Sequence, residues 1–247
     1  MQKKYELTNE FIEMNGIRLF RIKALVDFAE IKAGELGGYI EKEENLSQDG
    51  KAWVYEEAKV YGEAEVYGEA KVYGKAWVGG RAKVSGKAKV SGKAKVYGEA
   101  EVYGEAEVYE EAKVYGEAEV YEEAEVYGKA WVGGRAKVSG KAWVYEEAKV
   151  YEEAKISGEA KVSGNAKVSG EAKVSGNADY ATARGFGSVY RTTTFFRTRD
   201  KRIAVNCGCF YGTLDEFRSK VKETHGESKT AKEYMMLADL MEYRFSN

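Results

Sequence analysis

The hexapeptide Ala58-Lys59-Val60-Tyr61-Gly62-Glu63 shows the repeating unit that decides the fold of this chain. Alanine recurs at every sixth residue from Ala52 to Ala178, and a valine stands two residues after nearly every alanine. This second position departs from valine only at Ile156 and Tyr180. Because internal periodicity reflects repeated structural units, it predicts the architecture of more than half of the 247 residues.

A repeat of six residues predicts a β-solenoid. In Ala-x-Val the two apolar residues lie two apart, so on a strand both point to the same side. A period of six matches no helical period. Segment 74–86 recurs nine hexads later at 128–140, and segment 52–60 recurs fifteen hexads later at 142–150. Both shifts are multiples of three hexads, which a coil of three hexads would preserve.

The expected coil has three sides, with valine and alanine inside it. The repeats predict about seven coils and a prism on the order of 35 Å long, since neighbouring strands lie about 4.8 Å apart. Glycine occupies most corner positions, where a sharp turn favours a residue without a Cβ. Glutamate replaces it at positions 56, 110, 122, 146 and 152, so we do not expect a strictly left-handed backbone there.

The two ends of the chain lack the repeat, and we expect them to cap the solenoid. Residues 1–50 predict an N-terminal cap with a β-hairpin over Phe11–Ile22 that turns at Asn15-Gly16. Residues 51–180 form the predicted β-helix. Residues 181–247 are predicted to form a small ββαα domain.

That C-terminal domain is predicted from two strands and two capped helices. The expected strands are Tyr190–Phe196 and Ile203–Phe210. Thr213 and Glu216 form a capping box before the first helix, and Thr230 is expected to open the second.

Composition excludes some broad classes of function. The formal net charge of −2 gives no general attraction to nucleic acid or to membranes, and no apolar run is long enough for a membrane span. The two cysteines, Cys207 and Cys209, are too close in sequence for a good mutual disulfide. We therefore expect reduced thiols in a cytoplasmic protein.

The repeat resembles that of hexapeptide-repeat proteins, which fold as left-handed parallel β-helices. Segments 4–9, 36–46 and 207–217, followed by Thr224-His225-Gly226, look like hexapeptide-repeat proteins carried by bacteriophages and prophages. Those proteins are often labelled transferases on the repeat alone. The resemblance implies a phage origin and the cytoplasm of a bacterial host, and it implies no activity.

The histidine content argues against the enzymes known for this fold. Hexapeptide acyltransferases use a histidine as general base, and the β-helical carbonic anhydrases bind zinc through three histidines. This chain has one histidine, His225, outside the repeats and at the end of a predicted helix, where a structural role is expected. Cys207, Cys209 and His225 are a weak candidate set for zinc. We expect no catalytic residue, no metal and no cofactor.

Aromatic residues occupy the outward positions of the repeat. The prediction places four tryptophans on the outside and stacks five tyrosines on one face: Trp53, Trp77, Trp131 and Trp143; Tyr55, Tyr73, Tyr109, Tyr127 and Tyr145. Two roles remain open. The rings can stabilise the sheets as cross-strand ladders, or they can form an interface, including one for a homo-oligomer (trimer or dimer).

Charge is zoned along the chain. Residues 75–95 carry only basic charges, residues 99–125 are strongly acidic, and residues 129–141 are basic again. Solubility and repeat duplication explain such bands, and a landing site for a charged partner is the alternative. A further candidate patch for single-stranded nucleic acid comprises Arg191, Arg197, Arg199 and Arg202.

Together these observations favour a non-catalytic phage accessory protein. We expect it to bind or inhibit a host protein, such as a defence factor, through the aromatic and charged faces of the β-helix. One alternative is an acyl or sugar-nucleotide transferase of the hexapeptide type. The other is a nucleic-acid binder that uses the arginine-rich hairpin.

Overall fold

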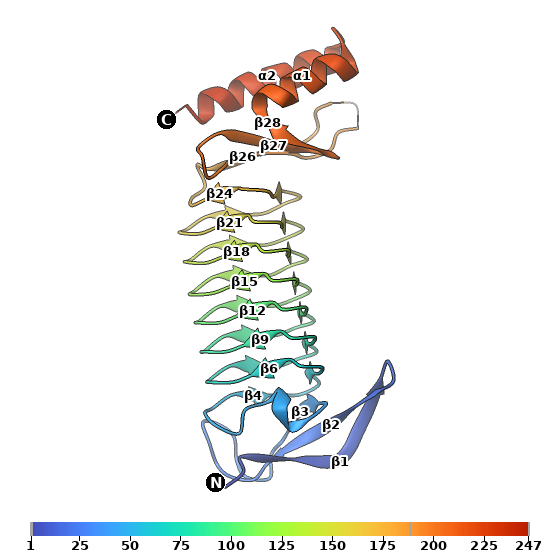
Figure 1. The fold of residues 1–247 in the computed structure, drawn as a ribbon, viewed down its shortest axis with the longest axis vertical. Coiled ribbons are helices and arrows are strands. Elements are labelled where there is room, and N and C mark those ends of the chain that lie inside the picture. Colours follow the sequence, from blue (N-terminus) through green and yellow to red (C-terminus); the bar gives the residue numbers. More distant parts are fainter. Residues whose placement is uncertain (1, 188, 247) are drawn as a thin grey trace.

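The computed structural model describes residues 2–187 and 189–246, and it is a long stack of coils with a distinct cap at each end (Figure 1). Each coil holds three short strands, and strands at equivalent positions of successive coils pair in parallel, as Lys95 pairs with Lys113. The predicted parallel solenoid with three hexads per coil is therefore confirmed.

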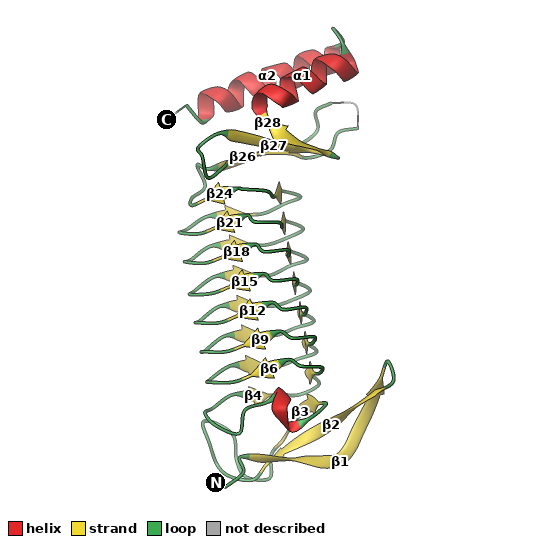
Figure 2. Ribbon diagram, viewed as in Figure 1, coloured by secondary structure: helices red, strands yellow, loops and turns green. Residues whose placement is uncertain are grey.

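The strands form three parallel faces along the stack (Figure 2). We name each face by its first repeat strand. The β4 face holds β4 (Trp53–Val54), β7 (Lys71–Val72), β10 (Lys89–Val90), β13 (Glu107–Val108), β16 (Glu125–Val126), β19 (Trp143–Val144) and β22 (Lys161–Val162). The β5 face holds β5 (Lys59–Val60), β8 (Trp77–Val78), β11 (Lys95–Val96), β14 (Lys113–Val114), β17 (Trp131–Val132), β20 (Lys149–Val150) and β23 (Lys167–Val168). The β6 face holds β6 (Glu65–Val66), β9 (Lys83–Val84), β12 (Glu101–Val102), β15 (Glu119–Val120), β18 (Lys137–Val138), β21 (Lys155–Ile156) and β24 (Lys173–Val174).

The solenoid extends beyond the hexads at its N-terminal end. β3 (Leu36–Ile40) pairs in parallel with β5, and Leu46 bridges to Val66. This irregular first turn brings the stack to about eight turns, compared with the seven expected from the repeats. A short 3₁₀ helix, η1 (Glu43–Asn45), lies within it. The cap and the repeats therefore share one continuous sheet.

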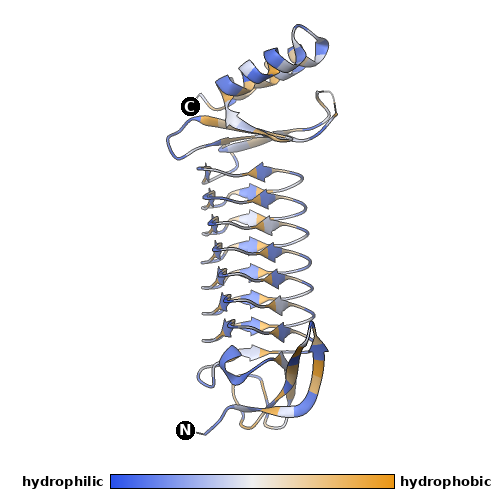
Figure 3. Cartoon of the chain, turned by 45° about the vertical axis from the view of Figure 1, so that its right-hand side comes forward, coloured by the Kyte–Doolittle hydropathy of each residue, from blue (hydrophilic) through white to orange (hydrophobic). Residues whose placement is uncertain are grey.

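Alanine and valine fill the interior as predicted. From Ala52 to Val174 both positions of the repeat are fully or almost fully buried. The intervening residue of each strand faces outward, so hydrophilic and hydrophobic residues alternate along the short strands (Figure 3). This alternation is what a strand with one buried side requires.

The corner residues correct one expectation. All five corner glutamates adopt left-handed backbone angles, with φ between 52° at Glu56 and 62° at Glu152, as the corner glycines do. At Glu56, Glu122, Glu146 and Glu152 the carboxylate offsets part of this cost, because it accepts a hydrogen bond from the corner N–H of the next coil. Gly140 donates to Glu122 over 2.6 Å, and Gly164 donates to Glu146 over the same distance. The expectation that a strictly left-handed backbone is not required at these corners is wrong.

The N-terminal cap contains the predicted hairpin. β1 (Tyr5–Met14) pairs with β2 (Ile17–Ala24), and the turn at Asn15-Gly16 has positive φ at both residues. The strands run longer than the predicted segment. β2 also pairs antiparallel with β3, which joins the hairpin to the β5 face.

Glu30 fastens the loop that follows β2 to the β4 face. Its carboxylate accepts hydrogen bonds from Lys71 Nζ at 2.5 Å and from the Tyr55 hydroxyl at 2.6 Å. These two bonds, the Lys71 bond first, lower the pKa of Glu30 to about 2. A carboxyl group with a lowered pKa adds stability above its unfolded pKa of about 4.3, and this contribution is lost as the pH falls toward 2.

We therefore expect Glu30→Gln to weaken the acid dependence of stability. Below about pH 4.3 the wild-type protein should lose free energy of unfolding more steeply than the variant, by less than about 1 kcal/mol because the carboxylate is half exposed. Urea denaturation at several pH values between about 7 and 2 measures this difference. Glu159→Gln, at an exposed glutamate, is the control. Identical pH profiles for wild type and Glu30→Gln would contradict the prediction.

The C-terminal domain has twice the expected number of strands. β25 (Tyr180–Ala183), β26 (Thr193–Arg197), β27 (Ile203–Cys207) and β28 (Phe210–Thr213) form one antiparallel sheet in that order. The predicted strand pair corresponds to β26 and β27. The predicted start at Ile203 is that of β27, but the other three predicted ends differ from the observed ones. The second predicted strand also runs across the turn at Gly208-Cys209, so it merges β27 with the start of β28.

Two helices cover this sheet on the side away from the solenoid (Figures 1 and 2). Helix α1 (Leu214–His225) begins with the predicted capping box of Thr213 and Glu216. Helix α2 (Lys229–Arg244) begins at the N-cap Ser228, so the prediction that Thr230 opens it is wrong. Helix α2 exposes Met236, Leu240 and Tyr243.

Candidate binding surfaces

The charge bands interlock through ion pairs between neighbouring coils. Lys87 Nζ lies 2.8 Å from Glu105, and Lys137 Nζ lies 2.6 Å from Glu119; each pair joins equivalent positions of adjacent coils. Other pairs of this kind are Arg81–Glu99, Lys89–Glu107, Lys93–Glu111, Arg135–Glu153 and Lys141–Glu123. The bands therefore neutralise one another where they meet, and each exposed pair contributes up to about 1 kcal/mol.

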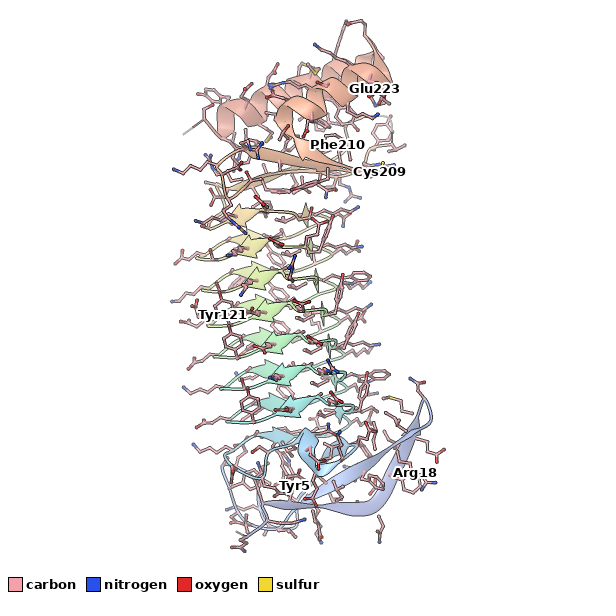
Figure 4. The ribbon with its side chains drawn as sticks, in the orientation of Figure 1. Tyr5, Arg18, Tyr121, Cys209, Phe210 and Glu223 are labelled. Atoms are coloured by element: carbon pink, nitrogen blue, oxygen red, sulfur yellow. The ribbon has the colours of Figure 1, made fainter. Side chains whose placement is uncertain are left out.

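The tyrosine row forms the predicted ladder on the β4 face. The rings of Tyr109 and Tyr127 stack with centroids 4.8 Å apart, and Tyr127 stacks on Tyr145 at 5.1 Å. Tyr55 meets Tyr73 edge to face at 6.4 Å. These contacts stabilise the sheet within one chain. Tyr121, on the β6 face, also lies on the outside of the stack (Figure 4) and stacks on Tyr103.

The four tryptophans do not form one surface. The prediction that Trp53 lies on the exposed surface is wrong, because its side chain is completely buried. It occupies an outward strand position, but the N-terminal cap covers it, and the rings of Tyr5 and Phe28 pack against it. Trp143 lies half-buried on the β4 face beneath Lys161. Trp77 and Trp131 lie on the β5 face.

The structure does not bring the four arginines of the predicted nucleic-acid patch together. Arg197 forms an ion pair with Asp179 and donates a hydrogen bond to the Phe245 carbonyl at the end of α2. Arg202 pairs with Asp200 in the turn between β26 and β27, and Arg199 extends toward Glu153. Arg191 precedes β26 at its opposite end.

The candidate zinc residues have other contacts. His225 ends α1, as predicted, and its ring centroid lies 5.9 Å from that of Tyr234. Cys207 accepts a hydrogen bond from the Thr193 hydroxyl at 3.2 Å, and Cys209 is exposed in the turn between β27 and β28 (Figure 4). Within residues 2–187 and 189–246, the structure has no group of three histidine, cysteine or acidic side chains that could hold a metal ion.

The β5 face has an outward row that differs from those of the other two faces. From the first repeat strand to the last, this row contains lysine and tryptophan only: Lys59, Trp77, Lys95, Lys113, Trp131, Lys149 and Lys167. The β4 and β6 faces carry glutamate in the corresponding rows. Beside the lysines stand Tyr61, Tyr97, Tyr115 and Tyr151. We call this surface, made of the row and these tyrosines, the lysine–aromatic face.

The tryptophans hold the lysines in place. The ammonium groups of Lys95 and Lys59 lie 4.5 Å and 5.9 Å from the ring of Trp77. Lys149 and Lys113 lie 4.5 Å and 4.7 Å from the ring of Trp131. Such cation–π contacts order lysine side chains without neutralising their charge. This surface is therefore a fixed positive charge on a rigid support.

Glycine makes room for the tyrosines of this face. A Cβ at Gly79 would lie 2.3 Å from the Tyr61 ring, and a Cβ at Gly133 would lie 2.3 Å from the Tyr115 ring. Each tyrosine thus extends over the glycine of the next coil. This contact explains why the motif Trp-Val-Gly-Gly-Arg, which occurs at 77–81 and again at 131–135, carries two consecutive glycines.

The lysine–aromatic face continues into the C-terminal domain. A groove of about 410 Å³ lies at its end and is lined by Lys149, Lys167, Arg184, Tyr190 and Arg191, together with Glu147. Arg191, the only member of the predicted arginine patch in this groove, therefore adds its charge to the lysines of the solenoid.

The sequence contained the signal for this face, but the prediction did not use it. Writing the hexads three to a line aligns the lysines in one row, as it aligns the tyrosines. The charge bands are continuous stretches of the sequence. The row takes one residue from each successive coil, so its lysines are not close together in the sequence.

In the part of the chain that the structure describes, no helix is long and apolar enough to cross a membrane. No protein-family model matches this sequence, and no curated protein matches it.

Proposed function

We propose that this protein is a non-catalytic binding scaffold, and that its lysine–aromatic face binds an acidic surface of another protein. In keeping with the phage resemblance, the proposed partner is a protein of the bacterial host, such as a defence factor, and the proposed site of action is the host cytoplasm.

One observation carries this proposal: the outward row of the β5 face combines positive charge with aromatic rings and contains no acidic residue. Lys95 and Lys113 are direct neighbours on adjacent strands, and each retains its charge against a tryptophan ring. Elsewhere the solenoid sets many lysines beside glutamates. An unneutralised row on a rigid support favours association with a surface of opposite charge.

Substituting four lysines of this row tests the proposal. The variant carries Lys59→Gln, Lys95→Gln, Lys113→Gln and Lys149→Gln, and the control carries Lys155→Gln, Lys161→Gln and Lys173→Gln on the other faces. Proteins captured from a bacterial lysate by the wild type are compared by quantitative mass spectrometry. We expect the captured partner to be retained by the control and lost about tenfold or more with the four-lysine variant. Equal capture by all three proteins would contradict the proposal.

Nucleic-acid binding is a second candidate, because the same lysines can contact phosphates. Nucleic-acid binding predicts that retention of the protein on nucleic acid falls steeply as salt is added. The ring contacts of Lys59 and Lys95 with Trp77, and of Lys113 and Lys149 with Trp131, leave these indoles less available for base stacking, which favours the protein partner.

Two further expectations remain predictions. Self-association as a trimer or dimer through a tyrosine row predicts an oligomeric mass at micromolar concentration. The transferase alternative predicts acetyl or sugar-nucleotide transfer above background, and no specific contact in the described structure favours it over the scaffold.

A further inference from the structure

The lysine–aromatic face is built from a unit that occurs twice along the stack. Residues Lys59, Tyr61, Trp77, Gly79 and Lys95 correspond to residues nine hexads later, with identical side chains: Lys113, Tyr115, Trp131, Gly133 and Lys149. The contacts are repeated as well. In both copies lysines flank one tryptophan, and the tyrosine covers the glycine. Nine hexads are three coils, so the copies are related by a translation of about 14 Å along the axis.

This translation places two like-charged lysine pairs on the same face. Lys95 stands opposite Lys113 on neighbouring strands, and Lys149 stands opposite Lys167 in the same way. The two lysines of each pair stand on adjacent coils, and in the first pair the ammonium group of Lys95 lies against Trp77 and that of Lys113 against Trp131. The second pair also borders the groove that contains Arg184 and Arg191 together with Glu147. A carboxylate that lies over the outward row at such a pair would gain a charge-assisted contact with a lysine that no glutamate of the row neutralises.

We infer that the two lysine pairs bind two carboxylates of one extended acidic segment, spaced four residues apart. An extended chain advances about 3.4 Å per residue, so four residues span about 14 Å, which is the separation of the pairs. Positions i and i+4 also lie on the same side of an extended chain. This inference rests on the proposed function, and it adds the conformation and the spacing of the partner's acidic groups.

Synthetic peptides test the spacing. Three peptides of equal length and charge carry two glutamates at i and i+2, at i and i+4, or at i and i+5 in a threonine- and serine-rich background. Their affinities for the full-length protein are measured at low salt by fluorescence polarisation. We expect the i, i+4 peptide to bind about tenfold more tightly than the other two, because its second contact is intramolecular. Equal affinities for all three peptides would overturn the inference.

Paired substitutions test the site. Lys95→Gln with Lys113→Gln, and Lys149→Gln with Lys167→Gln, should each remove the preference for the i, i+4 peptide. The control is Lys155→Gln with Lys173→Gln, an opposed lysine pair on the β6 face, which should leave the preference intact. If each lysine-pair variant loses only about half of the binding and no spacing is preferred, the two pairs act independently. The inference then fails while the proposed function stands.

Two other outcomes separate this inference from the proposed function. If neither the peptides nor poly-L-glutamate bind the wild-type protein at low salt, the proposed function fails together with the inference. If oligothymidylate binds more tightly than every peptide and either lysine-pair variant weakens it, the face recognises single-stranded nucleic acid, and the inference is overturned.

Discussion

Replacing Trp53 by alanine should lower the free energy of unfolding by about 3–5 kcal/mol, the cost of removing a large buried aromatic side chain. Trp53 is fully buried between the first coil and the cap, with the ring of Phe28 at 5.3 Å and that of Tyr5 at 6.1 Å. The cavity would lie where the cap joins the repeats, so the cap should detach first. Guanidinium denaturation, with hydrogen exchange in β1 and β2, measures both effects.

Two further variants make this prediction specific. Trp143→Ala, at a half-buried tryptophan on the same face, should cost less than half as much. The indole N–H of Trp53 is buried without a hydrogen-bond partner. Trp53→Phe removes this unsatisfied donor, whose burial costs about 1–3 kcal/mol, and should therefore be much milder than Trp53→Ala. Equal losses for Trp53→Ala and Trp143→Ala would contradict the position of the cap.

Replacing Gly98 by alanine should cost about 2–4 kcal/mol. The corner at Gly98 has φ of 79°, which a residue with a Cβ adopts at a cost of about 1–2 kcal/mol. In addition, the new Cβ would lie 2.8 Å from the backbone nitrogen of Gly116 in the next coil. Because this contact is with backbone, relief requires the two coils to move apart. Thermal and urea unfolding of the full-length chain measure the loss.

Gly34→Ala is the matched control, since Gly34 has φ of 91° but no atom lies within 4 Å of the position that its Cβ would take. It should cost only about 1–2 kcal/mol, the conformational part alone. We also expect Gly98→Glu to cost less than Gly98→Ala, although glutamate is larger. At Glu122 the carboxylate accepts the corner N–H of the next coil, and Gly116 offers the same N–H to a glutamate at position 98. A larger loss for Gly98→Glu would contradict the account of the corners.

The fold of the solenoid could be predicted because each hexad repeats the same pattern of residue types. Alanine and valine at a spacing of two give each strand one buried side, and segments that recur after multiples of three hexads give the number of hexads per coil. The hairpin turn at Asn15-Gly16 and the capping box at Thr213 were predictable for a similar reason. Their residue types have strong local preferences that do not depend on distant contacts.

Features that depend on distant contacts were not predictable. Trp53 occupies an outward position of the repeat, and only the folded cap buries it. Glutamate at a corner disfavours the left-handed backbone locally, but the stacked coils impose it, and a hydrogen bond to the next coil compensates for part of its cost. β25 was missed because it continues directly from the last hexad. Only its pairing with β26 makes it part of the C-terminal sheet.

The candidate site was only partly predictable. The interpretation identified Trp77 and Trp131 as outward-facing, and the structure places both on the lysine–aromatic face. The lysines beside them escaped notice because no local motif links residues on different coils. Their cation–π contacts and the absence of glutamate from their row become visible only when the coils are stacked.

Chemical footprinting tests most directly whether the lysine–aromatic face is the binding surface. The full-length protein is treated with an amine-reactive reagent at low salt, with and without poly-L-glutamate, and the modification of each lysine is quantified by mass spectrometry. The account predicts protection of Lys95, Lys113 and Lys149, while Lys155 and Lys173 on the β6 face stay as reactive as in the free protein. Equal protection of both groups, or protection of neither, would contradict it.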